Sequence, residues 1–167
     1  QILYLAAQEI GAESVSIESV NQLAYEKGGI GTAGITGVMG IGNIPVYNQM
    51  FLEQAKVIQK LASQKTCVFL GRCADFVLKN LENHYSFFIY ADDEFKEKRT
   101  KELYGNASVE DLHKEDKNRA DYYQYYTGQK WGDCGNYDMM INTSKISLED
   151  AADLIIAYVE HRQKNKA

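Results

Sequence analysis

The sequence predicts an α/β protein whose sheet is mainly parallel, and three observations lead to this fold class. Runs rich in β-branched and aromatic residues at 66–70, 84–90 and 137–142 have the length of buried strands. Longer segments with a helical spacing of apolar residues separate these runs along the chain. No hairpin turn joins any two of the runs, so each connection is a crossover, which pairs strands in parallel.

The first 65 residues are predicted to be helical apart from one glycine-rich run. Helices are expected at 1–10 and 14–27, each followed by glycine, and at 46–63 after Pro45, the only proline. Residues 28–42 contain seven glycines, including a G-x-G-x-x-G pattern that is typical of nucleotide-binding loops. Such a loop follows a strand and opens a helix, whereas a helical pattern precedes this one and further glycines follow. The run is therefore interpreted as a flexible loop or a mobile lid.

The rest of the chain is expected to contain four more helices, at 75–80, 92–104, 108–126 and 147–162. Ser108 is the expected N-cap of the third, and Asp111, three residues later, completes a variant of the capping box. Ser147 is expected to cap the last helix. Because neither repeats nor an interdomain linker are visible, the chain is predicted to form a single domain.

The composition and net charge of the chain argue against some classes of binding partner. With 167 residues, 45% of them hydrophobic, the chain is large enough to bury a core. A net charge of −5 argues against a nucleic-acid polymer as the main partner, because proteins that bind one usually present a basic face. No apolar run reaches the ~18 residues of a membrane span and no signal peptide is visible, which predicts a cytoplasmic protein without a membrane partner. The oligomeric state stays open, a homo-oligomer included.

The cysteines and histidines carry no metal signature. Three cysteines without a C-x-x-C pair are expected to be free thiols in a reducing compartment. The three histidines are scattered and lack the spacing of metal ligands, so no metal-binding residue is predicted. These residues are Cys67, Cys73, Cys134, His84, His113 and His161.

A polar turn directly follows the first predicted strand and has the sequence Gly71-Arg72-Cys73-Ala74-Asp75. Arg72 should therefore stand at the carboxyl edge of the sheet, where α/β proteins bind phosphates and carboxylates. Its planar guanidinium suits a phosphate group. A structural ion pair between Arg72 and Asp75 explains the same residues equally well.

Charged residues also gather on the predicted helices. Asp116 and Arg119 are three residues apart, so one helix face carries both and can hold a polar ligand. The alternative is an exposed ion pair that contributes little to stability. A basic cluster lies on the preceding helix, where a run of charge usually forms a solvated face. Its members are Lys96, Lys98, Arg99 and Lys101.

Aromatic side chains are concentrated late in the chain, at Tyr122, Tyr123, Tyr125, Tyr126 and Trp131. They could form a platform on which a base stacks. At helical spacing, however, aromatic residues more often serve packing, and this is the favoured interpretation.

Several motifs in this part of the chain carry a resemblance to a known family. They read D-x-x-R from Asp116, then Y-Y-x-Y-Y-T-G, W-G-D, N-Y-D and I-N-T-S. Together they resemble the cytidylate-kinase-like family of P-loop kinases, and the likeness is nearly continuous from Cys67 to Tyr158. It implies a P-loop kinase-like three-layer fold with a mainly parallel sheet and helical insertions that form a lid and a monophosphate-binding part.

The same resemblance implies a division of the single domain, 1–167. Residues 1–65 would form the helical monophosphate-binding part with the glycine-rich loop. Residues 66–144 would form the sheet core with the lid, and 145–167 the C-terminal helix.

Specific residues acquire expected roles from the resemblance. Arg72, Asp75, Asp116 and Arg119 would bind the nucleoside monophosphate. Related bacterial cytidylate kinases carry aspartate directly after the first of these arginines, where this chain has Cys73. A sugar or base contact would then be lost or moved to Asp75.

The other expected roles concern the phosphoryl donor. Arg99 would neutralise charge on the transferring group and act with Arg119 as a catalytic residue. Thr143 and Ser144 would border the adenine of ATP. The implied enzyme is an ATP-dependent phosphotransferase that uses Mg²⁺ and acts on CMP or a related small acceptor. The alternatives are a non-catalytic nucleotide-binding or regulatory protein on the same fold, or a kinase for another small metabolite.

A P-loop kinase needs the motif G-x-x-x-x-G-K-[ST], and no glycine of the sequence begins one. In the resembled family the motif precedes the helix expected at 1–10. Either an N-terminal segment with this loop lies outside the 167 residues, through truncation or disorder, or the protein is a degenerate member that binds nucleotide poorly. The first is favoured, because a sheet that lacks its central strand would leave a large void in the core.

Overall fold

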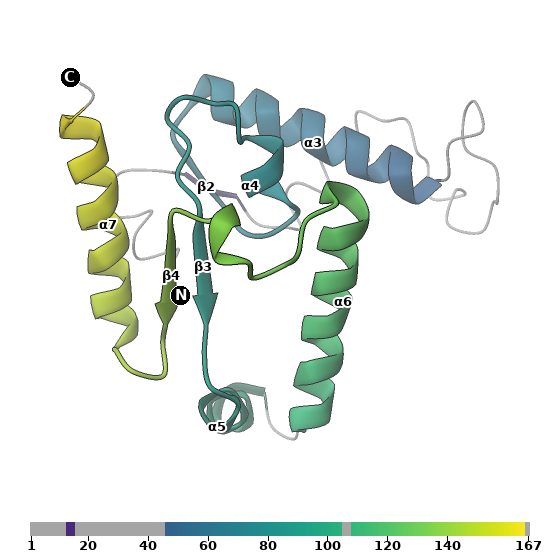
Figure 1. The fold of residues 1–167 in the computed structure, drawn as a ribbon, viewed down its shortest axis with the longest axis vertical. Coiled ribbons are helices and arrows are strands. Elements are labelled where there is room, and N and C mark those ends of the chain that lie inside the picture. Colours follow the sequence, from purple (N-terminus) through teal and green to yellow (C-terminus); the bar gives the residue numbers. More distant parts are fainter. Residues whose placement is uncertain (1–12, 16–45, 105–107, 166–167) are drawn as a thin grey trace. The chain divides into compact units, whose positions relative to one another are not determined.

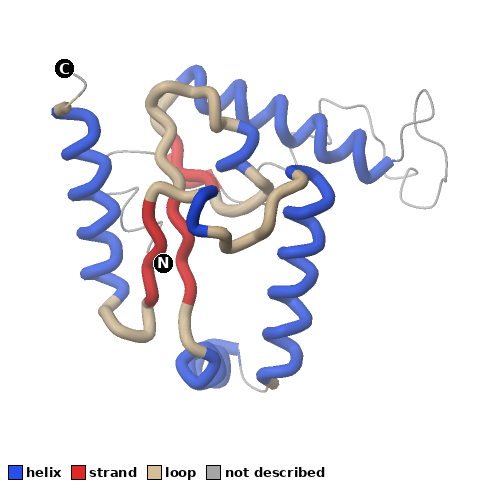
Figure 2. Tube along the Cα trace, viewed as in Figure 1, coloured by secondary structure: helices blue, strands red, loops and turns tan. Residues whose placement is uncertain are grey.

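The computed structural model describes residues 13–15, 46–104 and 108–165 (Figure 1). Helices and short strands alternate along the chain, and both strand pairs are parallel, as the sequence predicts (Figure 2). The described residues divide between two compact units, one that contains 13–15 with 46–81 and one that contains the residues from 82 on. Each unit has its own two-stranded sheet and its own buried cluster.

The first unit is built around the long helix α3 (Val46–Gln64). Strand β1 (Glu13–Val15) pairs in parallel with β2 (Cys67–Phe69), and the short helix α4 (Ala74–Val77) follows β2. Apolar residues on one face of α3 pack against α4 and the residue that follows it. The buried members of this cluster are Val57, Ile58, Ala74 and Leu78.

Two predictions for this unit were wrong. Ser14 and Val15 lie in β1, where Val15 pairs with Phe69, although the sequence predicts the start of a helix at this point. Backbone pairing with β2 satisfies the peptide groups here and overrides a local helical periodicity. The residues of β2 are half-buried rather than buried on both faces, and Leu70 after it is 56% exposed. The helix predicted at 1–10, residues 16–27 of the next one and the glycine run at 28–42 lie outside the described residues.

The second unit contains a parallel pair of strands and its larger helices. Its elements are β3 (Phe87–Tyr90), α5 (Asp93–Tyr104), α6 (Val109–Thr127), the 3-10 turn η3 (Cys134–Asn136), β4 (Met139–Asn142) and α7 (Leu148–Lys164). Phe87 pairs with Met139 and Tyr90 with Asn142, so the two strands end together at one carboxyl edge. The connections from that edge lead to α5 and α7.

Helix α7 supplies the core of the second unit and runs back alongside β4 (Figure 1). Ala151 and Ala152 are almost completely buried, because small side chains let the helix approach the strands closely. Ile155, one turn later, and Ile141 of β4 complete the buried cluster. No helix of the described residues is long and apolar enough to span a membrane.

Apart from α4, which ends at Val77 and not at the predicted residue 80, the helix ends follow the sequence predictions closely. The Ser108 hydroxyl accepts a hydrogen bond from the Asp111 amide (3.2 Å), and the Asp111 carboxylate accepts one from the Ser108 amide, which confirms the capping box of α6. Ser147 accepts from the Asp150 amide (3.0 Å) and caps α7, as predicted. Gly128, with φ of 71°, ends α6 in the left-handed conformation that glycine adopts readily.

Strands β3 and β4 are shorter than predicted, and a side chain explains where they begin. The Asp138 carboxylate accepts hydrogen bonds from the Ser86 amide (2.7 Å) and the Ser86 hydroxyl (3.2 Å). The Asp138 amide donates to the Ser86 carbonyl (2.8 Å). This cluster of polar contacts replaces the regular ladder at the amino end of both strands.

Candidate functional site

The turn after β2 holds its backbone in an unusual conformation. Gly71, Arg72 and Cys73 have consecutive φ values of 68°, 57° and 53°, all in the left-handed region. Residues other than glycine adopt this region at a cost of roughly 1 kcal/mol each, and such strain is concentrated at functional sites. The amide of Ala74 donates to the carbonyl of Gly71 (3.1 Å), which closes the turn and starts α4.

Arg72 follows the carboxyl end of β2, where the sequence places it, and its side chain is half-buried. Cys73 is only 3% exposed. Burial raises the pKa of the Cys73 thiol to about 12, the charge of Asp75 raises it further, and Arg72 opposes the shift. The thiol is therefore neutral and packs in the interior. Asp75, half-buried in the first turn of α4, is the nearby carboxylate for which the resemblance implies a contact to the acceptor.

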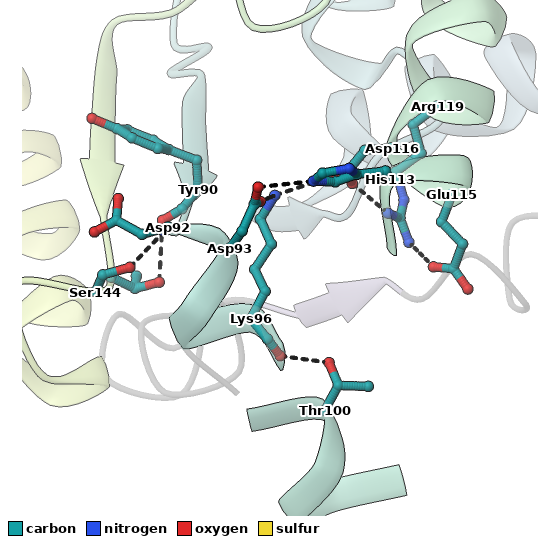
Figure 3. Close-up of polar contacts among 11 residues, drawn as sticks. Tyr90, Asp92, Asp93, Lys96, Thr100, His113, Glu115, Asp116, Arg119 and Ser144 are labelled. Atoms are coloured by element: carbon teal, nitrogen blue, oxygen red, sulfur yellow. Dashed lines mark hydrogen bonds and ion pairs between the residues drawn. The ribbon is translucent and has the colours of Figure 1, made fainter. Parts of the chain in front are cut away.

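At the carboxyl edge of the second sheet, Thr143 joins the end of β4 to the end of β3. Its amide donates to the Tyr90 carbonyl (2.9 Å), and its hydroxyl donates to the same oxygen (3.2 Å). Thr143 is 6% exposed, so its hydroxyl stabilises the loop from within. The Ser144 hydroxyl accepts a hydrogen bond from the Asp92 amide (2.7 Å), as Figure 3 shows. Both predicted adenine-bordering residues thus lie at the edge where open α/β sheets bind ligands.

Asp92 connects this loop to the start of α5 through its side chain as well. Its carboxylate accepts from the Asn142 amide group (3.1 Å) and pairs with the Lys145 ammonium (2.9 Å). The hydrogen bond from Lys145 is the main reason why the pKa of Asp92 is lowered, and the same bond raises the pKa of Lys145. The loop from Asn142 to Lys145 is consequently fixed against the beginning of α5.

Asp116 and Arg119 of α6 are in contact, as their spacing predicts. Arg119 Nη1 donates to Asp116 Oδ1 (2.7 Å), and Arg119 Nη2 donates to Glu115 Oε2 (2.8 Å). Asp116 Oδ2 accepts from the ammonium of Lys96 on α5 (2.9 Å) (Figure 3). Each oxygen of Asp116 therefore has a different cationic partner, and one of these partners comes from a second helix.

A second ion pair joins the same two helices. His113 Nε2 of α6 lies 2.8 Å from Asp93 Oδ2 of α5, and Lys96 lies 3.6 Å from the other oxygen of Asp93. The hydrogen bond with His113 is the main cause that lowers the pKa of Asp93. The hydrogen bond to Asp116 is the main cause that raises the pKa of Lys96. Both shifts favour the charged forms on which the ion pairs depend.

The structure separates the members of the basic cluster on α5. Lys96 faces α6, whereas Lys101 pairs with Glu97 along α5 itself (2.5 Å). Arg99 is half-buried one turn after Lys96, so the two cations lie on neighbouring parts of the same face.

The aromatic residues form two groups. On α6, Tyr126 contacts both Tyr122 and Tyr125, with ring centroids 4.7 and 4.8 Å apart, and stacking of a base on them stays a prediction. Trp131 contacts Phe88 of β3 edge to face at 5.1 Å between ring centroids, and Tyr137 also packs on Phe88 (4.9 Å). Tyr123 is buried, while Tyr125 is 66% exposed. A Cβ on Gly132 would lie 3.2 Å from the Phe88 ring, so glycine at this position allows the close approach.

The predicted site residues fall in both units. Arg72 and Asp75 belong to the first, whereas Arg99, Asp116, Arg119, Thr143 and Ser144 belong to the second. Sequence reasoning missed the contacts of Asp92, Asp93, Lys145 and His113. Asp92 and Asp93 follow a predicted strand almost directly, and this position was an available signal. Acidic residues there begin the next helix at the carboxyl edge of the sheet. The described residues contain no group of three or more His, Cys, Asp or Glu side chains that could hold a metal ion.

Comparisons with known proteins give this geometry a context. A model of the cytidylate kinase-like family matches residues 1–145. Among solved structures, an uncharacterized protein from Eubacterium ventriosum ATCC 27560 is similar, with 28% sequence identity and a TM-score of 0.78, over 96% of this chain and 90% of the other. No curated protein matches the chain. Because the family match extends over more than half of the residues, the chain belongs to the cytidylate kinase-like family.

Proposed function

We propose that the protein is a nucleoside monophosphate kinase that transfers the γ-phosphoryl group of ATP to CMP or a related small acceptor. Membership of the family indicates a nucleotide kinase-like function. The proposal includes this choice of acceptor, a cytoplasmic location and a P-loop kinase-like three-layer fold.

The observation that carries the proposal is the contact between Asp116 and Arg119 on α6. A guanidinium and a carboxylate at 2.7 Å offer a donor fork for a phosphate beside acceptors for the amino or hydroxyl groups of a nucleoside. The Arg119 side chain is 54% exposed, so an incoming anion can reach it. For Arg72 and Asp75 of the first unit, an acceptor contact is proposed on the resemblance to the family alone.

Two further groups would serve the phosphoryl donor. Arg99 on α5 would neutralise charge on the transferring phosphoryl group, as lid arginines do. The loop with Thr143 and Ser144 would border the adenine of the nucleotide, and its place at the carboxyl edge of β4, where backbone and hydroxyl contacts hold it, supports this role. Bound ATP with Mg²⁺ would supply the phosphoryl group, and this chain's residues would contribute orientation and charge neutralisation.

A coupled assay of ADP formation tests the proposal on protein expressed from its complete reading frame, with ATP and Mg²⁺ present. CMP, dCMP, UMP and AMP are offered separately as acceptors, and we expect the highest rate with CMP. Arg119→Ala should lower kcat/KM for CMP by about 100-fold, since it removes charged hydrogen bonds to the acceptor.

Arg162→Ala is the matched control, because Arg162 is an α7 arginine whose guanidinium contacts the Tyr158 hydroxyl (3.1 Å) outside the proposed site. It should leave the rate within about twofold of the natural protein, since surface substitutions away from a site have small effects. Saturable ATP binding without turnover of any acceptor would replace the proposal with a regulatory nucleotide-binding role. Turnover of a small metabolite that is not a nucleotide would replace only the acceptor.

A further inference from the structure

We propose that Lys96 is a positioning residue that holds Asp116 in the orientation in which the Asp116–Arg119 pair receives the phosphoryl acceptor. This inference rests on the proposed function and adds a residue from a second helix to it. Lys96 belongs to α5, twenty positions before Asp116 in the chain, and reaches it with its ammonium group (Figure 3).

The two oxygens of the Asp116 carboxylate have different partners. Asp116 Oδ2 contacts the Lys96 ammonium (2.9 Å), and Asp116 Oδ1 contacts Arg119 (2.7 Å). The carboxylate cannot rotate about its Cβ–Cγ bond without losing one of these contacts. Lys96 thereby fixes the plane of the carboxylate that Arg119 shares.

The two ends of this ion-pair network differ in exposure to solvent. The side chains of Lys96 and Asp116 are 28% and 29% exposed, whereas those of Arg119 and Glu115 are 54% and 62% exposed. A partly covered ion pair is screened less by salt and keeps its geometry better than an exposed one. Lys96–Asp116 is therefore the anchored half of the network, and Arg119 is the half that a ligand can reach.

Lys96 also changes the charge that an anionic acceptor meets at Arg119. Arg119 lies between two carboxylates, Glu115 and Asp116, which would together repel an incoming phosphate. Lys96 compensates one of these negative charges, so these four side chains sum to zero, and the Asp93 carboxylate, 3.6 Å from Lys96, has His113 as its own partner. Without the ammonium, an anionic acceptor would meet a repulsive field at the arginine that is meant to bind it.

The test compares variants by isothermal titration with CMP and by steady-state kinetics on protein from the complete reading frame. Lys96→Met keeps the aliphatic part of the side chain and removes the charge. We expect it to raise the KM and the Kd for CMP about 10-fold, which corresponds to the loss of one charged contact. We expect kcat and the KM for ATP to stay within about twofold, because the change acts on acceptor binding. Lys96→Arg should restore most of the affinity.

Two control variants separate positioning from a merely structural role. His113→Gln breaks the other ion pair between α5 and α6, with Asp93, and leaves Asp116 untouched. Lys117→Met removes a lysine of α6 that pairs with Asp121 on the same helix. Both should bind CMP like the natural protein.

Failure of the positioning role and failure of the proposed kinase function would give different results. A natural protein that uses CMP while Lys96→Met binds it unchanged overturns the positioning role alone. An equal loss in His113→Gln also overturns it, because docking of the two helices would then be the cause. If Lys96→Met fails to fold, Lys96→Gln retains a hydrogen-bond donor, and its unchanged KM for CMP would equally contradict the role of the charge. A natural protein that neither binds nor phosphorylates any nucleoside monophosphate overturns both proposals.

Discussion

Arg72 and Arg119, the two arginines proposed to meet the acceptor, are held in place by different means. Arg72 stands in a turn in which three successive residues have positive φ, next to a thiol that is 3% exposed. Arg119 lies on a regular helix and is oriented by ion pairs with Glu115 and Asp116. In the first case the backbone and buried packing determine the position, and in the second the side-chain charges do.

This difference predicts different sensitivities. Backbone strain and buried packing do not respond to salt, whereas exposed ion pairs weaken as ionic strength rises. Changes at the turn should therefore affect the free energy of unfolding strongly under all conditions. Changes in the charge network should have smaller effects that depend on the solution.

The largest effect is expected for Cys73→Asp, which places a carboxylate where the thiol is now buried beside Asp75. Burial and the neighbouring negative charge both oppose ionisation, so we expect a loss of about 3 kcal/mol in the free energy of unfolding at pH 7. The loss should shrink toward pH 4, where the new carboxyl group binds a proton. Urea unfolding measures it.

Cys134→Asp is the matched control, because Cys134 is exposed. Its free energy of unfolding should stay within about 0.5 kcal/mol of the natural protein. Equal losses for the two substitutions would mean that the turn does not depend on the buried thiol.

A smaller effect is expected for Gly71→Ala. The φ of 68° at this position is costly for any residue with a Cβ, so the free energy of unfolding should fall by about 1 kcal/mol. Measured in 0.05 M and in 1 M NaCl, the loss should be the same. A loss that disappears in high salt would contradict a backbone origin.

The loss of stability caused by Lys96→Met should depend on the salt concentration, unlike the loss caused by Gly71→Ala. Removing a partly exposed ion pair should lower the free energy of unfolding by about 0.5 kcal/mol in 0.05 M NaCl. In 1 M NaCl, where the Debye length is about 3 Å, this difference should become smaller, but less so than for a fully exposed pair, because the two side chains are only 28% and 29% exposed. The urea experiments described for Gly71→Ala also measure this difference. An undiminished loss in 1 M NaCl would mean that Lys96 stabilises the fold through packing and not through its charge.

The smallest effect concerns pH. The pKa of Asp93 is lowered below its ordinary value of 3.8, mainly by the hydrogen bond with His113. A carboxyl group with a depressed pKa in the folded state stabilises that state above pH 3.8, and this contribution is lost as the pH falls through the folded pKa. Asp93→Asn should therefore flatten the dependence of unfolding free energy on pH between about 4 and 2, measured by urea unfolding. An unchanged slope would show that the ion pair with His113 adds nothing to stability.

The sequence predicts well what short stretches of chain determine. Helix α3 begins and ends within one residue of its predicted limits, and Ser108 with Asp111 forms the predicted cap of α6. Asp116 and Arg119 meet because three positions of any helix bring two side chains to one face. These features follow from local geometry alone.

What the sequence does not predict depends on segments that lie far apart along the chain. The contact of Lys96 with Asp116 requires two helices to pack in one register, and no local pattern encodes it. The strand β1 is hidden within a helical periodicity, because its partner β2 lies more than fifty residues later. The burial of Cys73 similarly follows from the turn that precedes α4, which residue types do not reveal.

The parallel pairing of β3 with β4 also affects how the protein folds during synthesis. Phe87 pairs with Met139, so β3 leaves the ribosome 52 residues before its partner. At typical rates of translation this delay is roughly 3 to 10 s, whereas an isolated helix relaxes within about a microsecond. We expect pulsed hydrogen exchange during refolding to protect the amides of α6 before those of β3, and simultaneous protection would contradict this order. During the delay the nascent chain presents Phe87, Phe88 and Ile89 as an open, apolar strand edge, which is the kind of segment that ribosome-associated chaperones cover.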